Sequence, residues 1–145
     1  MEKTNLCSRA LEKDLYIKAT TDRVFRALID KEDLEHWFLK HAEVEMHPGG
    51  TIHFVWGTGT VNHGTILLLE PPRRLSYTWE SLSPSPTIIT FDLHPVYNGT
   101  HLHLSHTGIG EGPDWDNFYD TRNKGWDVHL SYLVAWLETG QQRIW

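Results

Sequence analysis

Hydrophobic and polar residues alternate in a series of short segments through the middle of the chain, a period typical of strands that bury one face. In chain order these segments are 42–46, 52–56, 65–70, 75–79, 89–93 and 102–106. Residues that favour turns separate them, among them Pro48-Gly49-Gly50, Pro71-Pro72 and the tight-hairpin pair Asn98-Gly99. An earlier alternation at Leu15 and Ile17 predicts a first strand, which brings the predicted strands to seven.

Two short helices are predicted between the first strand and the other six. Apolar residues at positions 24, 25, 28 and 29 form one stripe, and Thr20 or Thr21 can cap the helix that carries it. A second helix is predicted over 31–38, ending in the dipeptide Trp37-Phe38.

The segment 114–137 is the one long predicted helix. Its apolar residues recur at helical spacing, Asp114 can cap its start, and Gly140 lies just beyond its end. Strands with a single apolar face need a cover, and this amphipathic helix can supply it. The sequence therefore predicts an α+β fold in the order strand, two helices, six strands and helix, with a cleft between a curved sheet and the long helix.

The length of 145 residues fits one domain spanning 1–145, in which about the first eleven residues are polar and form a loose lead-in. Hydrophobic residues make up 39% of the chain and charged residues 22%, as in a folded globular protein. Seven Trp, five Tyr and five Phe bring the aromatic share to 12%. This is more tryptophan than a generic core requires, so the inner faces of sheet and helix need separate attention.

Charge and cysteine content exclude several classes of function. A net charge of −6 without a basic block lacks the positive surface that binds nucleic acid. The single cysteine, Cys7, excludes an intrachain disulfide and a cysteine-based zinc site. No apolar segment approaches a membrane span and residues 1–10 contain no apolar stretch of a signal peptide. We therefore expect no membrane insertion and a cytoplasmic location.

A set of short motifs extends over most of the chain, from about Leu15 to Leu137. In order they are Val24-Phe25-x-x-Leu28, Trp37-Phe38, Pro48-Gly49-Gly50, Glu70-Pro71-Pro72-Arg73-Arg74-Leu75 with Tyr77-Thr78-Trp79, Gly99-Thr100-x-Leu102-x-Leu104-x-His106-x-Gly108, and Gly125-Trp126-x-x-x-Leu130-x-x-Leu133. With these motifs in this order the chain resembles the helix-grip (SRPBCC) superfamily of START domains and birch-pollen allergens. More narrowly, it is similar to the bacterial single-domain branch related to the activator of a heat-shock chaperone ATPase.

The resemblance implies a curved antiparallel sheet wrapped around the C-terminal helix, with an internal hydrophobic cavity between them. Ligands in the superfamily range over lipids, polyketides and plant-type phenolics, and some relatives are cyclases or aromatases. In the eukaryotic co-chaperones the matching domain follows a separate N-terminal domain, which has no counterpart in this sequence. We therefore do not expect chaperone activation.

Twelve residues are candidates for the ligand site, because strand and helix periodicity directs them towards the predicted cleft or its ends. They are Trp37, Phe38, Phe54, Trp56, Tyr77, Trp79, Phe91, Leu104, His106, Trp115, Arg122 and Trp126. The alternative is that most of these side chains simply fill a core. Large rigid rings pack a concave space less easily than small branched residues, and aromatic walls with a few polar groups are typical of small-molecule pockets.

His106 shares a face with Leu102 and Leu104, so a buried imidazole is predicted there. A hydrogen-bonded core histidine or a polar anchor for a ligand is favoured over a general base, because no orienting carboxylate can be placed beside it. Tyr77 or a backbone carbonyl could be its partner. No residue is assigned as catalytic, and no cofactor is expected.

Four outward residues, Asp92, His94, His101 and His103, are predicted to lie together on one hairpin face. The His101-x-His103 spacing can ligate a transition metal. Outward strand positions are ordinarily polar, however, so no physiological metal site is assigned to this patch.

These observations favour a protein that holds a hydrophobic small molecule, with aromatic, polyketide-like and lipid-like ligands all left open. One alternative is a cyclase- or hydrolase-like enzyme that uses the same cavity, with His106 as acid or base. A second alternative is a co-chaperone-like interaction module, in which exposed aromatic residues including Ile144-Trp145 dock on another chain. A homodimer also remains open.

Overall fold

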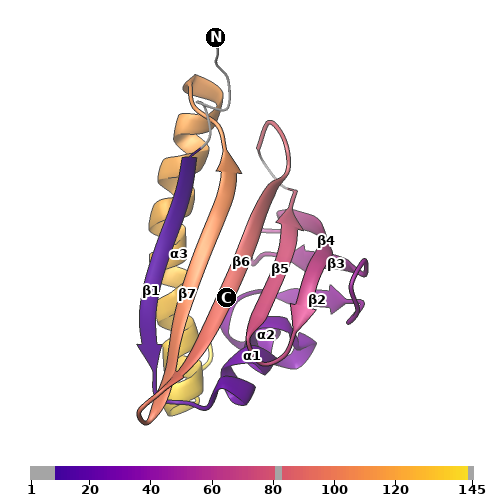
Figure 1. The fold of residues 1–145 in the computed structure, drawn as a ribbon. Helices are drawn as coiled ribbons and strands as arrows, with labels where there is room; N and C mark the ends of the chain where they lie inside the picture. Colours follow the sequence, from indigo (N-terminus) through magenta and orange to yellow (C-terminus); the bar gives the residue numbers. More distant parts are fainter. Residues whose placement is uncertain (1–8, 81–82, 144–145) are drawn as a thin grey trace.

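The computed structural model describes residues 9–80 and 83–143, which form one seven-stranded antiparallel sheet and three helices (Figure 1). The strands lie in the order β1-β7-β6-β5-β4-β3-β2. Their bounds are β1 Arg9–Ile17, β2 His41–Val44, β3 Thr51–Val55, β4 Val61–Glu70, β5 Arg74–Trp79, β6 Thr87–Val96 and β7 Gly99–Ile109. The two edge strands, β1 and β2, are therefore connected through the short helices, whereas each later strand pairs with the next one along the chain.

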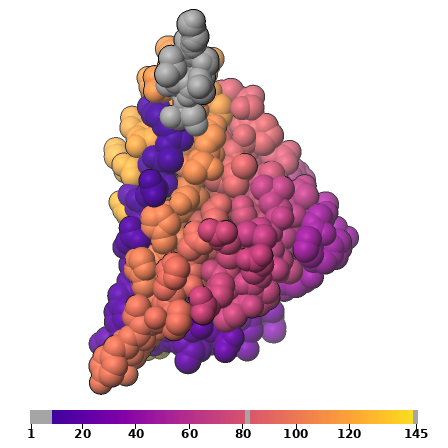
Figure 2. Space-filling model, viewed as in Figure 1, coloured from indigo at the N-terminus to yellow at the C-terminus, as the bar shows by residue number. Residues whose placement is uncertain are grey.

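The long helix α3, Pro113–Thr139, packs on the inner face of the sheet. The short helices α1, Thr21–Ile29, and α2, Lys31–Trp37, lie near its C-terminal half. Figure 2 looks onto the opposite face, where the side chains of the strands form the surface and α3 is visible only at the edge beside β1. This is the predicted α+β helix-grip arrangement. Among residues 9–80 and 83–143, no helix is long and apolar enough to cross a membrane.

The alternation of hydrophobic and polar residues in the sequence correctly predicts which side chains lie on the inner face of the sheet. The register aligns Tyr77 of β5 with Ile89 of β6, and Ile89 with His106 of β7. These three side chains are at most 1% exposed, as are their neighbours in the adjacent row, Leu75, Phe91 and Leu104.

Side-chain caps begin the two short helices. The hydroxyl oxygen of Thr20 accepts a hydrogen bond from the backbone N–H of Arg23, as predicted for one of the two threonines. The carboxylate of Asp30 accepts from the N–H of Asp33 in the same way and begins α2. Because Asp30 also ends α1, the two helices meet at this single residue.

Three expected boundaries are wrong. β1 begins at Arg9 within the predicted loose lead-in, because Leu11 is buried and pairs with His106, while residues 1–8 lie outside the described part. β4 begins at Val61 rather than at 65, since its first half pairs with β3 through residues that are not alternately apolar. Asp114 does not cap α3, because Gly112 is the N-cap residue and Pro113 is the first residue of the helix.

The hairpin between β6 and β7 turns one residue earlier than predicted. Val96 pairs with Gly99, so Tyr97 and Asn98 form the turn, and Asn98 takes the positive φ of 60°. Gly99 is the first residue of β7, where a Cβ would overlap the carbonyl oxygen of Ile17. The glycine is therefore needed for the approach of β1 rather than for the turn itself.

Candidate functional site

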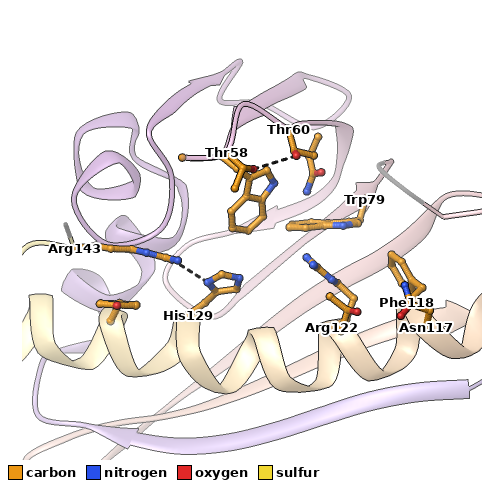
Figure 3. Close-up of a pocket in the computed structure, with 13 residues that line it drawn as sticks. Thr58, Thr60, Trp79, Asn117, Phe118, Arg122, His129 and Arg143 are labelled. Carbon is orange, nitrogen blue, oxygen red and sulfur yellow. Dashed lines mark hydrogen bonds between the residues drawn. The ribbon is translucent and has the colours of Figure 1, made fainter. Parts of the chain in front are cut away.

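A pocket of about 570 Å³ lies between one side of α3 and the turn that joins β3 to β4 (Figure 3). Its lining consists of Trp56, Gly57, Thr58, Thr60, Asn62, Trp79, Asn117, Phe118, Thr121, Arg122, His129, Tyr132 and Arg143. This volume falls within the range of small-molecule sites, about 300–1,000 Å³.

The two walls of the pocket are the β3–β4 turn and one face of α3, and the local sequence determines the conformation of each. Trp56 follows β3 directly, and the turn closes through hydrogen bonds between Trp56 and Thr60 and between Gly59 and Trp56, with Gly59 at a φ of 92°. On α3 the lining residues recur at helical intervals, from Phe118 through Arg122 to Tyr132. A helix face and a tight turn therefore oppose each other across the space.

Aromatic side chains form the apolar part of the lining. The rings of Trp56 and Trp79 meet edge to face with their centroids 6.0 Å apart. Phe118 and Tyr132 contribute two further rings from α3. Four such surfaces suit a flat, largely apolar molecule.

The charged side chains of the lining are Arg122 and Arg143, and the lining contains no carboxylate. Burial lowers the pKa of both guanidinium groups, which nevertheless remain positive at any physiological pH. Within the described ranges no carboxylate forms an ion pair with Arg122, whose guanidinium carbon lies 6.0 Å from the centre of the Phe118 ring. Figure 3 shows Arg122 and His129 projecting from α3 into the same space.

His129 is held in one tautomer by Arg143. The guanidinium Nη1 of Arg143 donates to Nδ1 of His129 over 3.0 Å, which leaves the proton of the neutral ring on Nε2. Burial, followed by the positive charges of Arg143 and Arg122, lowers the pKa of His129 to about 3. The ring is therefore neutral at pH 7 and presents an N–H donor.

Arg143 is itself fixed from several directions. Its guanidinium lies 4.5 Å from the centre of the Tyr132 ring, and its backbone N–H donates to the carbonyl of His36 over 2.8 Å. The segment after α3 is thus held against α2 and closes one end of the pocket.

Asn62 supplies a further polar group. Its side chain is 1% exposed, and its Nδ2 has no hydrogen-bond partner within 9–80 and 83–143. An amide N–H left unpaired in a buried position costs about 1–3 kcal/mol. An acceptor placed within hydrogen-bond distance of Nδ2 would remove this cost.

Comparison with protein families and solved structures defines the relatives of this chain. Residues 18–138 match the family model described as activator of Hsp90 ATPase homolog 1-like protein. The chain belongs to this family. No curated protein matches it significantly in sequence.

The solved relatives of this family member share its fold over nearly the whole length. Protein MLL2253 from Mesorhizobium loti is 25% identical with a TM-score of 0.81, over 90% of this chain and 97% of that one. The Aha1 dimer from Colwellia psychrerythraea is also 25% identical with a TM-score of 0.81, over 91% and 98%. DynU16, a protein of the dynemicin biosynthetic locus, shares the fold at 22% identity and a TM-score of 0.82, over 92% of this chain and 48% of its own.

In this activator-homolog fold only three of the twelve predicted ligand residues line the pocket, namely Trp56, Trp79 and Arg122. The other nine are Trp37, Phe38, Phe54, Tyr77, Phe91, Leu104, His106, Trp115 and Trp126, and none of them is part of the lining. All of these except Trp115 are at most 2% exposed, so they form core. Trp115 lies further towards the start of α3, with its ring edge-on to that of Phe118.

Phe38 explains why the centre of the expected cleft is filled. It ends α2 and its ring lies between sheet and helix, with centroid distances of 6.2 Å to Phe54, 6.4 Å to Trp79 and 5.7 Å to Trp126. Trp37 does not lie near a cavity mouth, because its indole N–H donates to the carbonyl of Ala27 inside the α1–α2 layer.

His106 has both ring nitrogens occupied. Trp126 Nε1 donates to its Nδ1 over 3.1 Å, and its Nε2 lies 2.7 Å from the hydroxyl of Thr87. Burial, with a smaller contribution from Arg122, lowers the pKa of His106 to about 3. The partners are thus Trp126 and Thr87, not Tyr77 or a backbone carbonyl, and the ring is a neutral, completely buried histidine.

The four outward residues Asp92, His94, His101 and His103 do not bind one another as a single cluster but contact different partners. Asp92 binds Arg74 over 2.6 Å, whereas His101 and His103 both bind Asp14 of β1 over 2.8 Å. His94 stacks on His101. Within the part of the chain that the structure describes, no three histidine, cysteine or acidic residues are grouped so as to hold a metal ion.

Sequence reasoning missed His129, Asn62 and Arg143. A signal existed for His129, because it lies seven residues after Arg122 and therefore on the same helix face. Asn62 could have been placed only by extending β4 towards Val61. Nothing local identifies Arg143, since it follows the helix and reaches the pocket through tertiary contacts.

Proposed function

We propose that the chain binds a small, flat and largely aromatic molecule in the pocket between α3 and the β3–β4 turn. The observation that carries this proposal is the pocket itself, about 570 Å³ with the rings of Trp56, Trp79, Phe118 and Tyr132 in its lining. Burying one aromatic body against such walls removes apolar surface of both ligand and pocket from water, which favours binding by about 25 cal/mol per Å². Membership of the family and the likeness to a protein of the dynemicin biosynthetic locus are compatible with ligand binding.

A neutral fluorescent naphthalene tests this proposal. N-phenylnaphthylamine is titrated into the protein, and binding is followed by its own emission and by quenching of the tryptophans. Thr121→Trp should weaken binding at least tenfold, because position 121 is on α3 in the lining and a large ring there occupies the space. Lys124→Trp places the same ring on the exposed side of α3, outside the lining, and should leave binding unchanged.

A broader screen of flavonoids, aromatic polyketides and fatty acids would identify the ligand class. Preference for flat aromatic molecules over fatty acids is the expected result. Absence of binding to every member and to N-phenylnaphthylamine would refute the proposal.

The alternative of an enzyme with His106 as acid or base has little support in the geometry. A general base must reach a proton of the substrate and exchange it near the working pH. The ring of His106 is 0% exposed and lies outside the pocket lining, and its pKa of about 3 keeps it neutral. The interaction-module alternative relied on Ile144 and Trp145, which lie outside the described residues.

We propose further that the chain forms a homodimer. The support is the Colwellia psychrerythraea relative, which was solved as a dimer and is 25% identical over 91% of this chain. Light scattering coupled to gel filtration should give twice the monomer mass at micromolar concentration. A monomer mass that persists up to the highest soluble concentration would exclude the dimer.

A further inference from the structure

The pocket has a charge opposite to that of the protein that carries it. The chain has a net charge of −6, yet the charged residues of the lining are two arginines. A partly enclosed cleft with one sign of charge and apolar walls concentrates the field and attracts molecules of opposite charge.

The charge of Arg122 has no carboxylate partner among the residues that the structure describes. Its guanidinium is nevertheless partly buried against Phe118. Desolvating a guanidinium without a counter-charge is unfavourable, and a bound anion removes this penalty through hydrogen bonds that are stronger than neutral ones.

The remaining polar groups around Arg122 are also donors. His129 presents Nε2–H because Arg143 occupies its Nδ1. Asn62, 1% exposed, has an Nδ2 with no partner among the described residues. Three donors from three different side chains therefore belong to one lining, and a ligand that fits them must offer acceptor oxygens.

The aromatic walls define the rest of such a ligand. Trp56 and Trp79 meet edge to face on one side, and Phe118 lies on α3 one turn before Arg122. A purely lipid tail would leave the donors unsatisfied, and a small inorganic anion would leave the rings uncovered. A flat ring system that carries an anionic group satisfies both.

We propose that the pocket is selective for aromatic anions, with Arg122 as the counter-charge and His129 Nε2 and Asn62 Nδ2 as additional donors. The ligand class comprises aromatic carboxylates, sulfonates and ionised phenols. This inference rests on the proposed function, since it specifies the chemistry of the molecule bound in the same pocket.

Two probes with the same skeleton separate the two proposals. Anilinonaphthalene sulfonate carries a permanent negative charge, whereas N-phenylnaphthylamine is neutral. Binding of the sulfonate should be about tenfold tighter, should compete with the neutral probe, and should weaken as sodium chloride is added. The affinity of the neutral probe should not depend on salt.

Arg122→Met should weaken binding of the sulfonate at least tenfold more than binding of the neutral probe, so that the preference is lost, and Arg122→Lys should retain most of the preference. Lys124→Met removes an equal charge from the exposed side of the same helix and is the matched control, with the preference unchanged. Circular dichroism and thermal melting establish that each variant is folded. If Arg122→Met fails to fold, the competition and salt dependence measured on the unmodified protein decide the question.

The outcomes distinguish the proposals. Equal affinity for both probes, or tighter binding of the neutral one, overturns the inference and leaves the proposed function standing. Binding of neither probe overturns both. A preference for the sulfonate that Lys124→Met reduces as much as Arg122→Met does would locate the effect outside the pocket, and would also overturn the inference.

Discussion

The indole nitrogen of Trp126 donates a hydrogen bond to Nδ1 of His106 across 3.1 Å and so joins the middle of α3 to the inner face of β7. A donor on Nδ1 requires an unprotonated nitrogen there, so His106 carries its single proton on Nε2, towards Thr87. The same arrangement recurs in His129, where Arg143 is the donor. Two imidazoles in one domain therefore have their tautomer fixed by a donor on Nδ1, and burial keeps both of them neutral.

Acid is expected to destabilise the fold through these two histidines. The pKa of each is about 3 in the folded chain and about 6.5 in the unfolded chain, so between these values only the unfolded state takes up the proton. Stability therefore rises with pH in this window. Each histidine should cost about 2 kcal/mol on going from pH 7 to pH 5.

Urea unfolding at the two pH values measures this loss. In His106→Gln and in His129→Gln the loss of stability between pH 7 and pH 5 should be smaller by the contribution of the replaced histidine. This holds whatever the substitution does to stability at pH 7. The same substitution at the exposed His47 is the control. A loss of stability between pH 7 and pH 5 that is the same in all three variants would contradict the assignment.

The sequence was sufficient for most of the fold, because strand faces are encoded locally. The residues Leu75, Tyr77 and Trp79 alternate with polar ones, and the structure buries all three. The exceptions have non-local causes. The start of β1 depends on pairing with β7, about a hundred residues away, and the polar start of β4 pairs with β3 without a continuous apolar face.

The candidate site was harder to predict than the fold. Periodicity indicates that Phe38 and Trp126 point inward, but it does not show that Phe38 fills the centre of the space between helix and sheet. The pocket therefore lies to one side, where turn residues such as Thr58 and the segment after α3 meet. Contacts of this kind depend on how elements pack, which local spacing does not determine.

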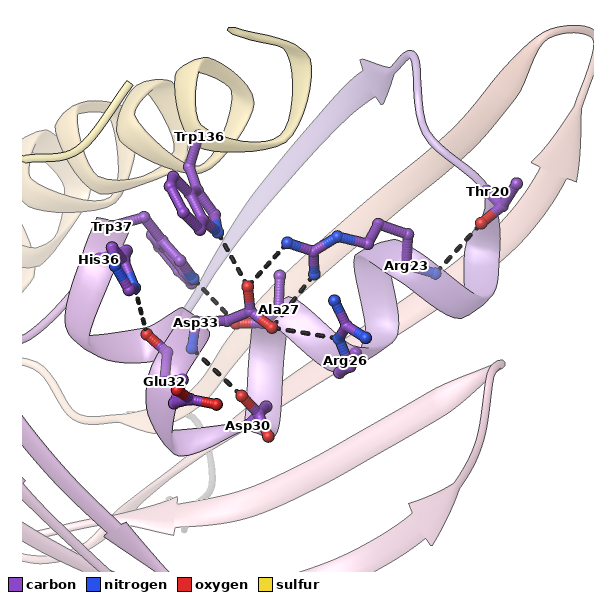
Figure 4. A network of polar contacts seen from close by, with 10 residues as sticks. All are labelled: Thr20, Arg23, Arg26, Ala27, Asp30, Glu32, Asp33, His36, Trp37 and Trp136. Atoms are coloured by element: carbon purple, nitrogen blue, oxygen red, sulfur yellow. Dashed lines mark hydrogen bonds and ion pairs between the residues drawn. The ribbon is translucent and has the colours of Figure 1, made fainter. Parts of the chain in front are cut away.

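Asp33 is expected to contribute strongly to stability, because it joins α1, α2 and α3 (Figure 4). Its carboxylate accepts from Arg23 over 2.7 and 3.1 Å and from Trp136 over 2.9 Å. Burial raises the pKa of Asp33, but the hydrogen bonds from Arg23 and Trp136 and the charges of Arg23 and Arg26 together outweigh burial and leave the pKa below its ordinary value.

Asp33→Asn should lower the free energy of unfolding by about 2–3 kcal/mol in urea titrations at pH 7. Trp136→Phe removes only the indole donor while a ring remains to stack on His36, so it should cost about 1 kcal/mol. Asp120→Asn changes an exposed carboxylate on α3 and is the control. If Asp33→Asn proves no more harmful than Asp120→Asn, the network has no stabilising role.

Two glycines are expected to respond in opposite directions to alanine. A Cβ on Gly64 of β4 would overlap the carbonyl oxygen of Thr78 on β5, so Gly64→Ala must displace one strand. On Gly125 of α3 the nearest atom to a Cβ is His129 Nε2 at 3.6 Å, an ordinary contact. Gly125→Ala should therefore stabilise the helix by about 1 kcal/mol and raise the melting temperature by about 3 °C.

Thermal melting of the two variants beside the unmodified protein measures both effects. Gly64→Ala should melt well below the unmodified protein, because backbone overlap in a sheet should lower the free energy of unfolding by more than about 2 kcal/mol. A lower melting temperature for Gly125→Ala would mean that the helix at this position is more crowded than the structure indicates.

The outer face of the sheet is expected to contain one histidine that stays protonated above the usual range. Asp14 of β1 binds both His101 and His103 over 2.8 Å, and Glu12 adds a contact of 3.1 Å to His103. The hydrogen bond that His103 donates to Asp14 is the main cause of the raised pKa of His103, which burial partly opposes. This interaction stabilises the fold below pH 6.5 and is lost as the pH rises through the higher, folded-state pKa, opposite in sign to the two buried histidines.

Histidine ring resonances followed by NMR between pH 5 and pH 9 should give a pKa for His103 above 6.5 in the unmodified protein. Asp14→Asn should lower it. Asp92→Asn is the matched control, because Asp92 also lies directly across from His103, on β6, but is bound to Arg74 over 2.6 Å. A larger shift with Asp92→Asn than with Asp14→Asn would show that β6, not β1, supplies the charge that His103 senses.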